Sequence, residues 1–290
     1  MSSEPLAKFS AAVVAERAAW SGPKRTAVVL RQSELAFEAG DQRLSIPLQS
    51  VFDVKVGSVP PMFESLPGVG VTVAYETDGD RVVAAFGAEE SVVRKFFPAI
   101  FKTILNDTLV KIKHPATRGG RVTGAAFESA LLSVATNAVV FDADARQVRI
   151  GIDAVIGFSR TQQSIQGADR PAMIVRHVEQ GAAVTTRVAT ESPRTLSLLG
   201  RYLRRQYDER LASLRQLSLA DAEVKTLITI YSTRGTGVAP GDVLDFPAKQ
   251  VRALLGSLQK KSLIRRGESG PELTITGQVV VTQYLDRINE

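Results

Sequence analysis

Two short stretches hold residue types that could do chemistry. Asp142 and Asp144 open like a calcium-binding loop, but Arg146 stands where a third oxygen ligand is required, and the later glycine and glutamate are missing. This stretch therefore favours a hairpin turn. His177 and Glu179 have the His-x-Glu spacing of zinc deaminases, yet those enzymes need paired cysteines and the chain has no cysteine. His177 is predicted to be an ordinary strand residue.

The remaining search for a catalytic group gives nothing. The second histidine, His114, is followed by Pro115 in a predicted linker and has no evident partner. The segment GTGVAPG lacks the glycine spacing that holds a phosphate, and no P-loop lysine motif exists. Without cysteine the chain has no disulfide, thiolate zinc site, iron–sulfur cluster or cysteine nucleophile. We expect a protein that is not an enzyme and that has no metal and no cofactor.

Length and charge suit a soluble protein of several domains. The chain has 290 residues, of which 44% are hydrophobic, and a net charge of +6. This length accommodates two or three ordinary domains. No run approaches the roughly 18 apolar residues of a membrane helix, and charges at Glu4, Lys8, Glu16 and Arg17 interrupt any signal-peptide core. The expectation is a cytoplasmic protein with no membrane span.

Residues 22 to about 87 alternate between apolar and polar, as half-buried strands do. The predicted strands are TAVVLR, ELAFEA, RLSIPL, SVFDVKVG, VGVTVAYE and DRVVAAFG, and Asp78-Gly79 marks a hairpin between the last two. The period then changes to about four, which predicts a helix from roughly 88 to 107. Pro98 lies inside this helix and predicts a kink or a break.

The same pattern then repeats. A shift of 104 positions places residues 37–55 over 141–159, and a shift of 102 places VGVTVAYETDGDRVVAAFGAEE over PAMIVRHVEQGAAVTTRVATES. Gly79 then meets Gly181, and the change from strand to helix occurs at the same point. A duplication explains both matches. Each copy, antiparallel strands closed by one helix, has the outline of a pleckstrin-homology-like (PH-like) barrel.

The helix of the second copy is predicted to be longer than a barrel needs. It begins near Ser192-Pro193 and runs for about 25 residues, or about 37 Å. Its apolar stripe consists of Leu196, Leu199, Leu203, Tyr207, Leu211 and Leu214. The excess length should pack on the tail, on a second subunit or on a partner, and on this basis we expect a homodimer.

The last segment has the order helix, helix, helix, hairpin, helix, which is that of a winged helix. The predicted fold is thus α+β: two tandem PH-like antiparallel barrels, each capped by a C-terminal helix, and then a winged-helix-like domain. The predicted boundaries are 1–112, 113–216 and 217–290.

A winged helix allows a second function, DNA binding by a transcriptional regulator. Helix 246–261 would enter the major groove, with Arg265 and Arg266 on the wing. From residue 217 onward, however, nine Lys and Arg stand against eight Asp and Glu. A nearly neutral domain argues against DNA, so no nucleic-acid partner is expected and this reading is kept as the alternative.

The tail segments LSLADAEVKTLITIYS, VLDFPAKQVRALLGSLQKKSLIRR and ELTITGQ resemble the archaeal taxis protein CheF family. The segment TAVVLRQSELAFEAGDQRLSIPLQSVFDVKVG of the first copy is also similar, so the resemblance spans nearly the whole chain. It implies a non-enzymatic adaptor in archaeal chemotaxis. Such an adaptor links the phosphorylated response regulator CheY to the cytosolic ring of the archaellum motor, forms elongated dimers and receives CheY on its tail.

The candidate CheY-binding residues lie on the tail. Tyr231 and Arg234 end its first predicted helix, and Lys260, Lys261, Arg265 and Arg266 form its basic strip. Response regulators of the CheY type often present an acidic face, so electrostatic attraction is the physical basis for this choice.

Overall fold

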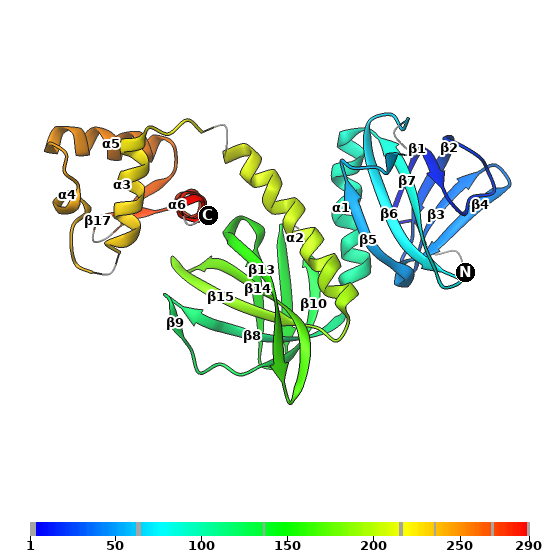
Figure 1. Ribbon diagram of the computed structural model, residues 1–290, viewed down its shortest axis with the longest axis horizontal. Coiled ribbons are helices and arrows are strands. Elements are labelled where there is room, and N and C mark those ends of the chain that lie inside the picture. The colour runs from blue at the N-terminus through cyan, green and yellow to red at the C-terminus, as the bar shows by residue number, and fades with distance from the viewer. Residues whose placement is uncertain are drawn as a thin grey trace.

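The computed structural model describes residues 4–61, 65–135, 137–214, 217–234, 236–267 and 270–288. Figure 1 shows three parts side by side: a first sheet (blue to cyan), a second sheet (green) and a tail (orange to red), with helix α2 (Pro193–Leu214) running diagonally past both sheets. Both large sheets are antiparallel, so the predicted α+β class is confirmed. The finer assignments, PH-like and winged-helix-like, stay predictions.

The first sheet has seven strands in the order β4-β3-β2-β1-β7-β6-β5. Its first strand lies in the middle and pairs with both the second strand and the last. The 3-10 turn η1 (Leu48–Ser50) follows the fourth strand, and α1 (Glu90–Leu105) follows the seventh. The strands are β1 (Ala7–Ala15), β2 (Lys24–Leu30), β3 (Glu34–Ala39), β4 (Gln42–Pro47), β5 (Val51–Val56), β6 (Val69–Thr77) and β7 (Asp80–Ala88).

The second sheet repeats this arrangement in the order β12-β11-β10-β8-β15-β14-β13, and a short strand β9 (Arg121–Val122) pairs with β8. The turn η3 (Ile152–Ala154) lies 104 residues after η1, and a register irregularity follows each turn at the same place. The strands are β8 (Thr108–Arg118), β10 (Glu128–Ala135), β11 (Ala138–Ala143), β12 (Arg146–Gly151), β13 (Val155–Ile165), β14 (Ala168–Glu179) and β15 (Ala182–Ala189). This correspondence supports the duplication inferred from the sequence.

Two predictions are wrong, and one strand was not predicted. Strand β1 was missed because its small residues alternate too weakly for the strand pattern to stand out. Helix α1 continues through Pro98, so the predicted break is wrong, while the alternative of a kink stays a prediction. The predicted boundary at 112/113 falls inside β8, so residues 108–112 belong to the second sheet and not to the first.

One continuous core extends through both sheets and both helices. Phe97 and Phe101 of α1 pack against Tyr202 of α2, with ring centroids 6.1 and 5.7 Å apart. Helix α2 therefore serves both copies, and the buried part of its leucine stripe is occupied within the chain. This removes the reason for which the stripe was assigned to a dimer contact.

The tail has its own small core and follows the expected order of elements. Around the buried side chains of Leu227, Leu258 and Val281 it packs three helices and a hairpin. Its elements are α3 (Asp221–Ser232), α4 (Pro240–Val243), α5 (Ala248–Lys260), β16 (Ile264–Gly267), β17 (Gly270–Leu273) and α6 (Ile275–Ile288). Within the described residues, no helix is long and apolar enough to cross a membrane.

Candidate partner-binding site

Helix α2 holds the three parts together by polar contacts along its length. Arg194 donates to the carbonyl oxygens of Leu48 (2.6 Å) and Val51 (2.5 Å) at the η1 corner of the first sheet. About two turns further along, Arg201 forms two 2.9 Å hydrogen bonds to the Asp53 carboxylate. Charge-assisted pairs with this bidentate geometry fix orientation as well as distance. The N-terminal half of α2 is thereby attached to the first sheet.

The C-terminal half of α2 attaches to the equivalent corner of the second sheet. Arg210 donates to the carbonyl oxygens of Asp153 and Val155, which correspond to the η1 corner after a shift of 104. The Tyr207 hydroxyl donates to the Ile156 carbonyl at 3.0 Å. Gln283 of α6 donates to the same hydroxyl at 3.1 Å, so the tail joins this attachment.

The tail rests on the second sheet over a small area. A cluster of three buried apolar residues, Ile156, Val178 and Val279, joins the sheet to α6. On this side the β14–β15 turn, with Gly181 at its tip, approaches the tail. Gly181 has a φ of +74°, and a Cβ added there would lie 3.3 Å from Arg234 Nη2 and 4.0 Å from Arg265 Nη2. Two guanidinium groups of the tail thus face one turn of the sheet.

A cavity of about 460 Å³ opens at this meeting point, and we name it the junction cavity. Its ionisable lining residues are Arg234, Arg265 and Glu272. Glu272 accepts hydrogen bonds from Arg265 Nε (3.2 Å) and Nη2 (3.1 Å). Within the described residues, no side chain forms a hydrogen bond or ion pair with the Arg234 guanidinium, so the lining keeps one uncompensated positive charge. The junction cavity is lined by Gly181, Ile230, Thr233, Arg234, Gly237, Val238, Ala239, Pro240, Arg265, Gly270, Pro271, Glu272 and Leu273.

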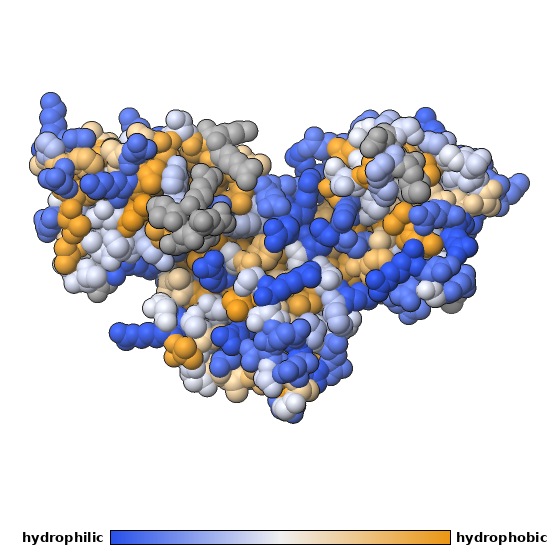
Figure 2. Space-filling view, viewed as in Figure 1, coloured by the Kyte–Doolittle hydropathy of each residue, from blue (hydrophilic) through white to orange (hydrophobic). Residues whose placement is uncertain are grey.

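The rim of the junction cavity is partly apolar. Val238, which lines it, is 46% exposed, and Tyr231, next to the lining residue Ile230 in sequence, is 42% exposed. Figure 2 shows hydrophobic side chains reaching the surface of the tail between hydrophilic ones. Exposed tyrosine and arginine beside apolar side chains are characteristic of protein interfaces. This surface has the composition of a docking site for a partner.

The six predicted site residues do not form one strip. Arg234 and Arg265 meet at the junction cavity, and Tyr231 lies on the same helix end. Lys261 lies at the opposite end of α3, where its ammonium contacts the carboxylate of the buried Glu223 at 2.7 Å and the Ser218 carbonyl at 2.7 Å. Lys261 therefore stabilises the tail, and its assignment to a basic surface strip is wrong.

The remaining two residues are exposed but lie apart from the cavity lining. Lys260 ends α5, and Arg266 follows Arg265 directly on β16. Successive strand residues point to opposite faces, so Arg266 faces away from the side on which Arg265 meets Gly181.

The contact between Lys261 and Glu223 also affects the acidity of Glu223. Burial raises the pKa of Glu223, but hydrogen bonds from Lys261, Ser257 and the Ala220 amide outweigh this effect and hold that pKa below its ordinary value.

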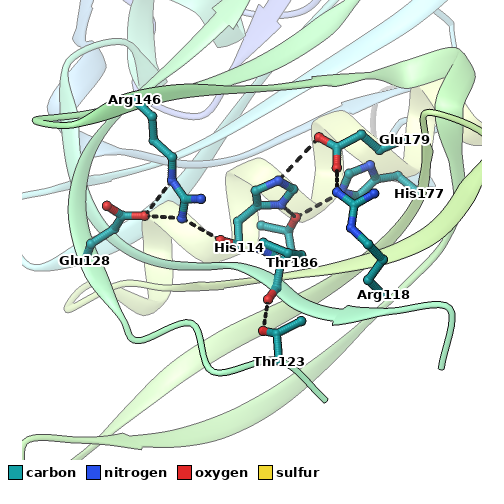
Figure 3. A network of polar contacts seen from close by, with 9 residues as sticks. His114, Arg118, Thr123, Glu128, Arg146, His177, Glu179 and Thr186 are labelled. Atoms are coloured by element: carbon teal, nitrogen blue, oxygen red, sulfur yellow. Dashed lines mark hydrogen bonds and ion pairs between the residues drawn. The ribbon is translucent and has the colours of Figure 1, made fainter. Parts of the chain in front are cut away.

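The second sheet contains a buried polar network (Figure 3), and His114 is part of it. His114 Nδ1 lies 2.7 Å from the Thr186 hydroxyl, and His177 Nε2 lies 2.9 Å from the same oxygen. His114 Nε2 faces a Glu179 carboxylate oxygen at 3.4 Å, and Arg118 pairs with the other oxygen of Glu179. The expectation of a linker histidine without a partner is therefore wrong, because β8 carries His114 into the interior.

The geometry fixes the direction of these hydrogen bonds. A carboxylate only accepts, so a neutral His114 presents its Nε2–H to Glu179 and accepts at Nδ1 from the Thr186 hydroxyl. Thr186 in turn accepts from the Nε2–H of His177. Burial lowers the pKa of His177 to about 4, helped by the neighbouring His114. Burial also lowers the pKa of His114, although Glu179 opposes this shift.

Burial and hydrogen bonding in the network favour neutral histidines inside the sheet. Across the described ranges, no group of three or more His, Cys, Asp or Glu is placed to hold a metal ion. His177 is the strand residue that was predicted. The calcium-like stretch is also the predicted hairpin: Asp142 lies in β11, and Arg146 begins β12 and pairs with Glu128.

The sequence model of the family described as "Archaeal Chemotaxis signal transduction system protein F" (CheF-arch) matches residues 7–209, which is more than half of the chain. The chain belongs to the CheF family. It is 32% identical over 289 residues to taxis protein CheF2 of Halobacterium salinarum, with both chains covered completely. It is 28% identical to taxis protein CheF1 of the same organism over 153 residues, which are 52% of this chain and 50% of that one.

Membership in this family gives the chain a role in archaeal chemotaxis. Proteins of the family are components of signal transduction, so the alternative of a DNA-binding regulator receives no support from these comparisons. The family match covers the two sheets and most of α2, while the full-length match to CheF2 also includes the tail.

Proposed function

We propose that this protein is a cytoplasmic, non-enzymatic adaptor that binds phosphorylated CheY on its tail and couples it to the cytosolic ring of the archaellum motor. In this proposal the two sheets are PH-like domains that bind the motor ring, and the tail is a winged-helix-like domain that binds CheY. The observation that carries it is the junction cavity, where an apolar rim and two convergent guanidinium groups form one surface.

The position of this surface supports coupling. A partner seated there touches the tail and also the β14–β15 turn of the second sheet. The second sheet is connected to the first through α2, by Arg210 at one corner and by Arg194 and Arg201 at the other. A signal at the tail therefore has a continuous route of packed contacts to both sheets. For the adaptor to switch, phosphorylated CheY must bind more tightly than the unphosphorylated form.

Binding of purified CheY to the full chain tests this proposal. We expect CheY activated with beryllium fluoride to bind at least tenfold more tightly than untreated CheY. Arg234→Glu and Arg265→Glu should each reduce the affinity of the activated form, because they place a carboxylate opposite an acidic partner face. Lys260→Glu is the matched control, since it reverses an exposed charge on the same domain but outside the cavity lining.

Two outcomes would contradict the proposal. Equal and negligible binding of both CheY forms would remove CheY as the partner. An effect of Lys260→Glu as large as that of Arg234→Glu would move the docking site away from the junction cavity. Lys261 is unsuitable for such a test, because its reversal would leave Glu223 buried without its cation and unfold the tail.

The predicted homodimer is tested separately. The buried stripe of α2 is occupied within the chain, so a dimer would have to use another surface. Light scattering of the full chain at several concentrations measures the mass. A monomer mass throughout would overturn the dimer and leave the binding proposal intact.

A further inference from the structure

We infer that the junction cavity is a binding site for an oxyanion, a carboxylate or phosphoryl group held between Arg234 and Arg265 beside the Gly181 turn. The site stands on its own geometry. Only the identification of the anion's carrier as the CheY partner rests on the proposed function.

The guanidinium groups of Arg234 and Arg265 converge on one point. Both Nη2 atoms lie within about 4 Å of the point where a Cβ of Gly181 would be. A group with two acceptor oxygens placed at that point could accept from both arginines at once, and a planar guanidinium suits carboxylate and phosphate oxygens.

The charge of the lining favours an anion. Among the described residues, two guanidinium groups and one carboxylate, that of Glu272, make up the ionisable lining. Glu272 contacts Arg265 through Nε and Nη2, and no described residue pairs with the Arg234 guanidinium. Like charges this close repel each other, and a bound anion removes the repulsion.

The junction cavity has room for an anion. Gly181 contributes no side chain, and the cavity of about 460 Å³ is large enough for a phosphate or for the end of an acidic side chain. Its walls include both the tail and the sheet. An anion bound there would tie the tail to the second sheet, in addition to contacts such as the Ile156–Val178–Val279 cluster and the Gln283–Tyr207 hydrogen bond.

Titration of the full chain with inorganic phosphate, at constant ionic strength kept with chloride, tests the site by calorimetry. We expect saturable one-site binding that Arg234→Gln and Arg265→Gln each weaken by about tenfold, as loss of a charge-assisted hydrogen bond of about 1.4 kcal/mol would do. Arg266→Gln, the strand neighbour that faces away, should leave phosphate binding unchanged.

A pair of substitutions at Gly181 sharpens the test. Asn and Asp both tolerate positive φ and have the same size. Gly181→Asp supplies an internal carboxylate at the proposed position and should abolish phosphate binding, whereas Gly181→Asn should retain part of it. Equal phosphate affinity in these two variants and in the unaltered chain would overturn the inference, as would phosphate binding that Arg234→Gln does not change.

A competition experiment separates this inference from the proposed function. If phosphate binds and displaces activated CheY, the anion comes from the partner and both proposals stand. If phosphate binds at Arg234 and Arg265 without affecting CheY, the site takes a free anion and the docking position proposed above is wrong. If CheY binds as proposed and neither phosphate nor the Gly181 pair has any effect, the oxyanion site is wrong and the adaptor stands.

Discussion

The two sheets share one backbone plan but have different interiors. The strand order, the 3-10 corners and the irregularities after them correspond position by position. Where the first sheet has Tyr75 and Ala84, the second has His177 and Thr186. Both sets are buried, yet only the second is connected by hydrogen bonds. The two copies share one fold, and at these positions the copy that carries the tail has polar side chains.

The contrast shows what a buried polar group requires. The Tyr75 hydroxyl is buried and, among the described residues, has no hydrogen-bond partner. In the second sheet the Thr186 hydroxyl forms hydrogen bonds with ring nitrogens of both His114 and His177. The Glu179 carboxylate contacts the other ring nitrogen of His114. Such a network stabilises only while every member is satisfied. The network lies beside the β14–β15 turn that faces the tail. We therefore expect a change in its hydrogen bonding to affect the docking surface.

The largest expected effect comes from removing the central hydroxyl. Thr186→Val keeps the shape of the side chain but leaves the ring nitrogens of His114 and His177 without their shared partner. Each unsatisfied buried group costs about 1–3 kcal/mol, so we expect the free energy of unfolding to fall by about 3 kcal/mol. Urea denaturation followed by circular dichroism measures it. A loss below about 0.5 kcal/mol, the size of an ordinary surface change, would show that the hydroxyl is not the centre of a network.

The next effect is the dependence of stability on pH, between pH 7.5 and pH 5, that the buried histidine gives to the second sheet. The pKa of His177 is lowered to about 4 from an ordinary 6.5, so the unfolded chain binds the proton more readily than the folded one. The stability contributed by neutral His177 is complete above about pH 6.5 and is lost as the pH falls toward 4. We expect about 2 kcal/mol less stability at pH 5 than at pH 7.5.

A chimeric interior tests the origin of this pH dependence. The triple variant His177→Tyr, Thr186→Ala and His114→Ala gives the second sheet the residue types of Tyr75, Ala84 and Ala15 in the first. Its stability should change less between pH 7.5 and pH 5 than that of the unaltered chain. If the triple variant folds and keeps the full dependence, carboxylates elsewhere cause it.

A smaller effect distinguishes the two corners that α2 holds. Arg194→Met keeps the aliphatic stem but loses two hydrogen bonds to the η1 corner, at a cost of about 1–2 kcal/mol. Hydrogen exchange should increase at η1 and at the start of α2 and not at η3. Arg210→Met should have the reverse distribution. Exchange that rises at both corners in either variant would mean that the two sheets open as one unit.

The smallest effect is expected at Tyr75. Among the described residues its hydroxyl has no hydrogen-bond partner, so no hydrogen bond adds to the free energy of unfolding there. Burial raises the pKa of this hydroxyl. Tyr75→Phe should therefore change the unfolding free energy by less than about 0.5 kcal/mol, or stabilise the chain slightly. A clear destabilisation in thermal unfolding would reveal a bound water on the hydroxyl and would reduce the contrast between the sheets.

Local patterns were sufficient for most of the elements but not for the contacts between them. Alternation and turn residues predicted β2 to β7, and period-four spacing predicted α1 and α2. The offset of 104 between the copies is also the offset between η1 and η3, because a duplicated corner keeps its backbone. β1 was missed, since a stretch of small residues has little alternation to detect.

The candidate site was less accessible to sequence reasoning. Arg234 and Arg265 were selected as basic residues, but their meeting at Gly181 depends on how the tail rests on the second sheet. Lys261 was assigned to the surface because its partner Glu223 lies 38 residues earlier in the chain. The network of His114, His177 and Thr186 joins three separate strands, so no local signal could have indicated it.

The pairing of the first strand with the last in each sheet also affects how the chain acquires structure during synthesis. Ala12 pairs with Gly87, so the first sheet stays incomplete until its seventh strand has left the ribosome. The second sheet waits in the same way for β15 to reach β8. Pairings this distant make folding slow relative to helical proteins. Helix α2 follows both sheets in the chain, so the contacts that it makes with the two copies can form only after the strands of both have been synthesised.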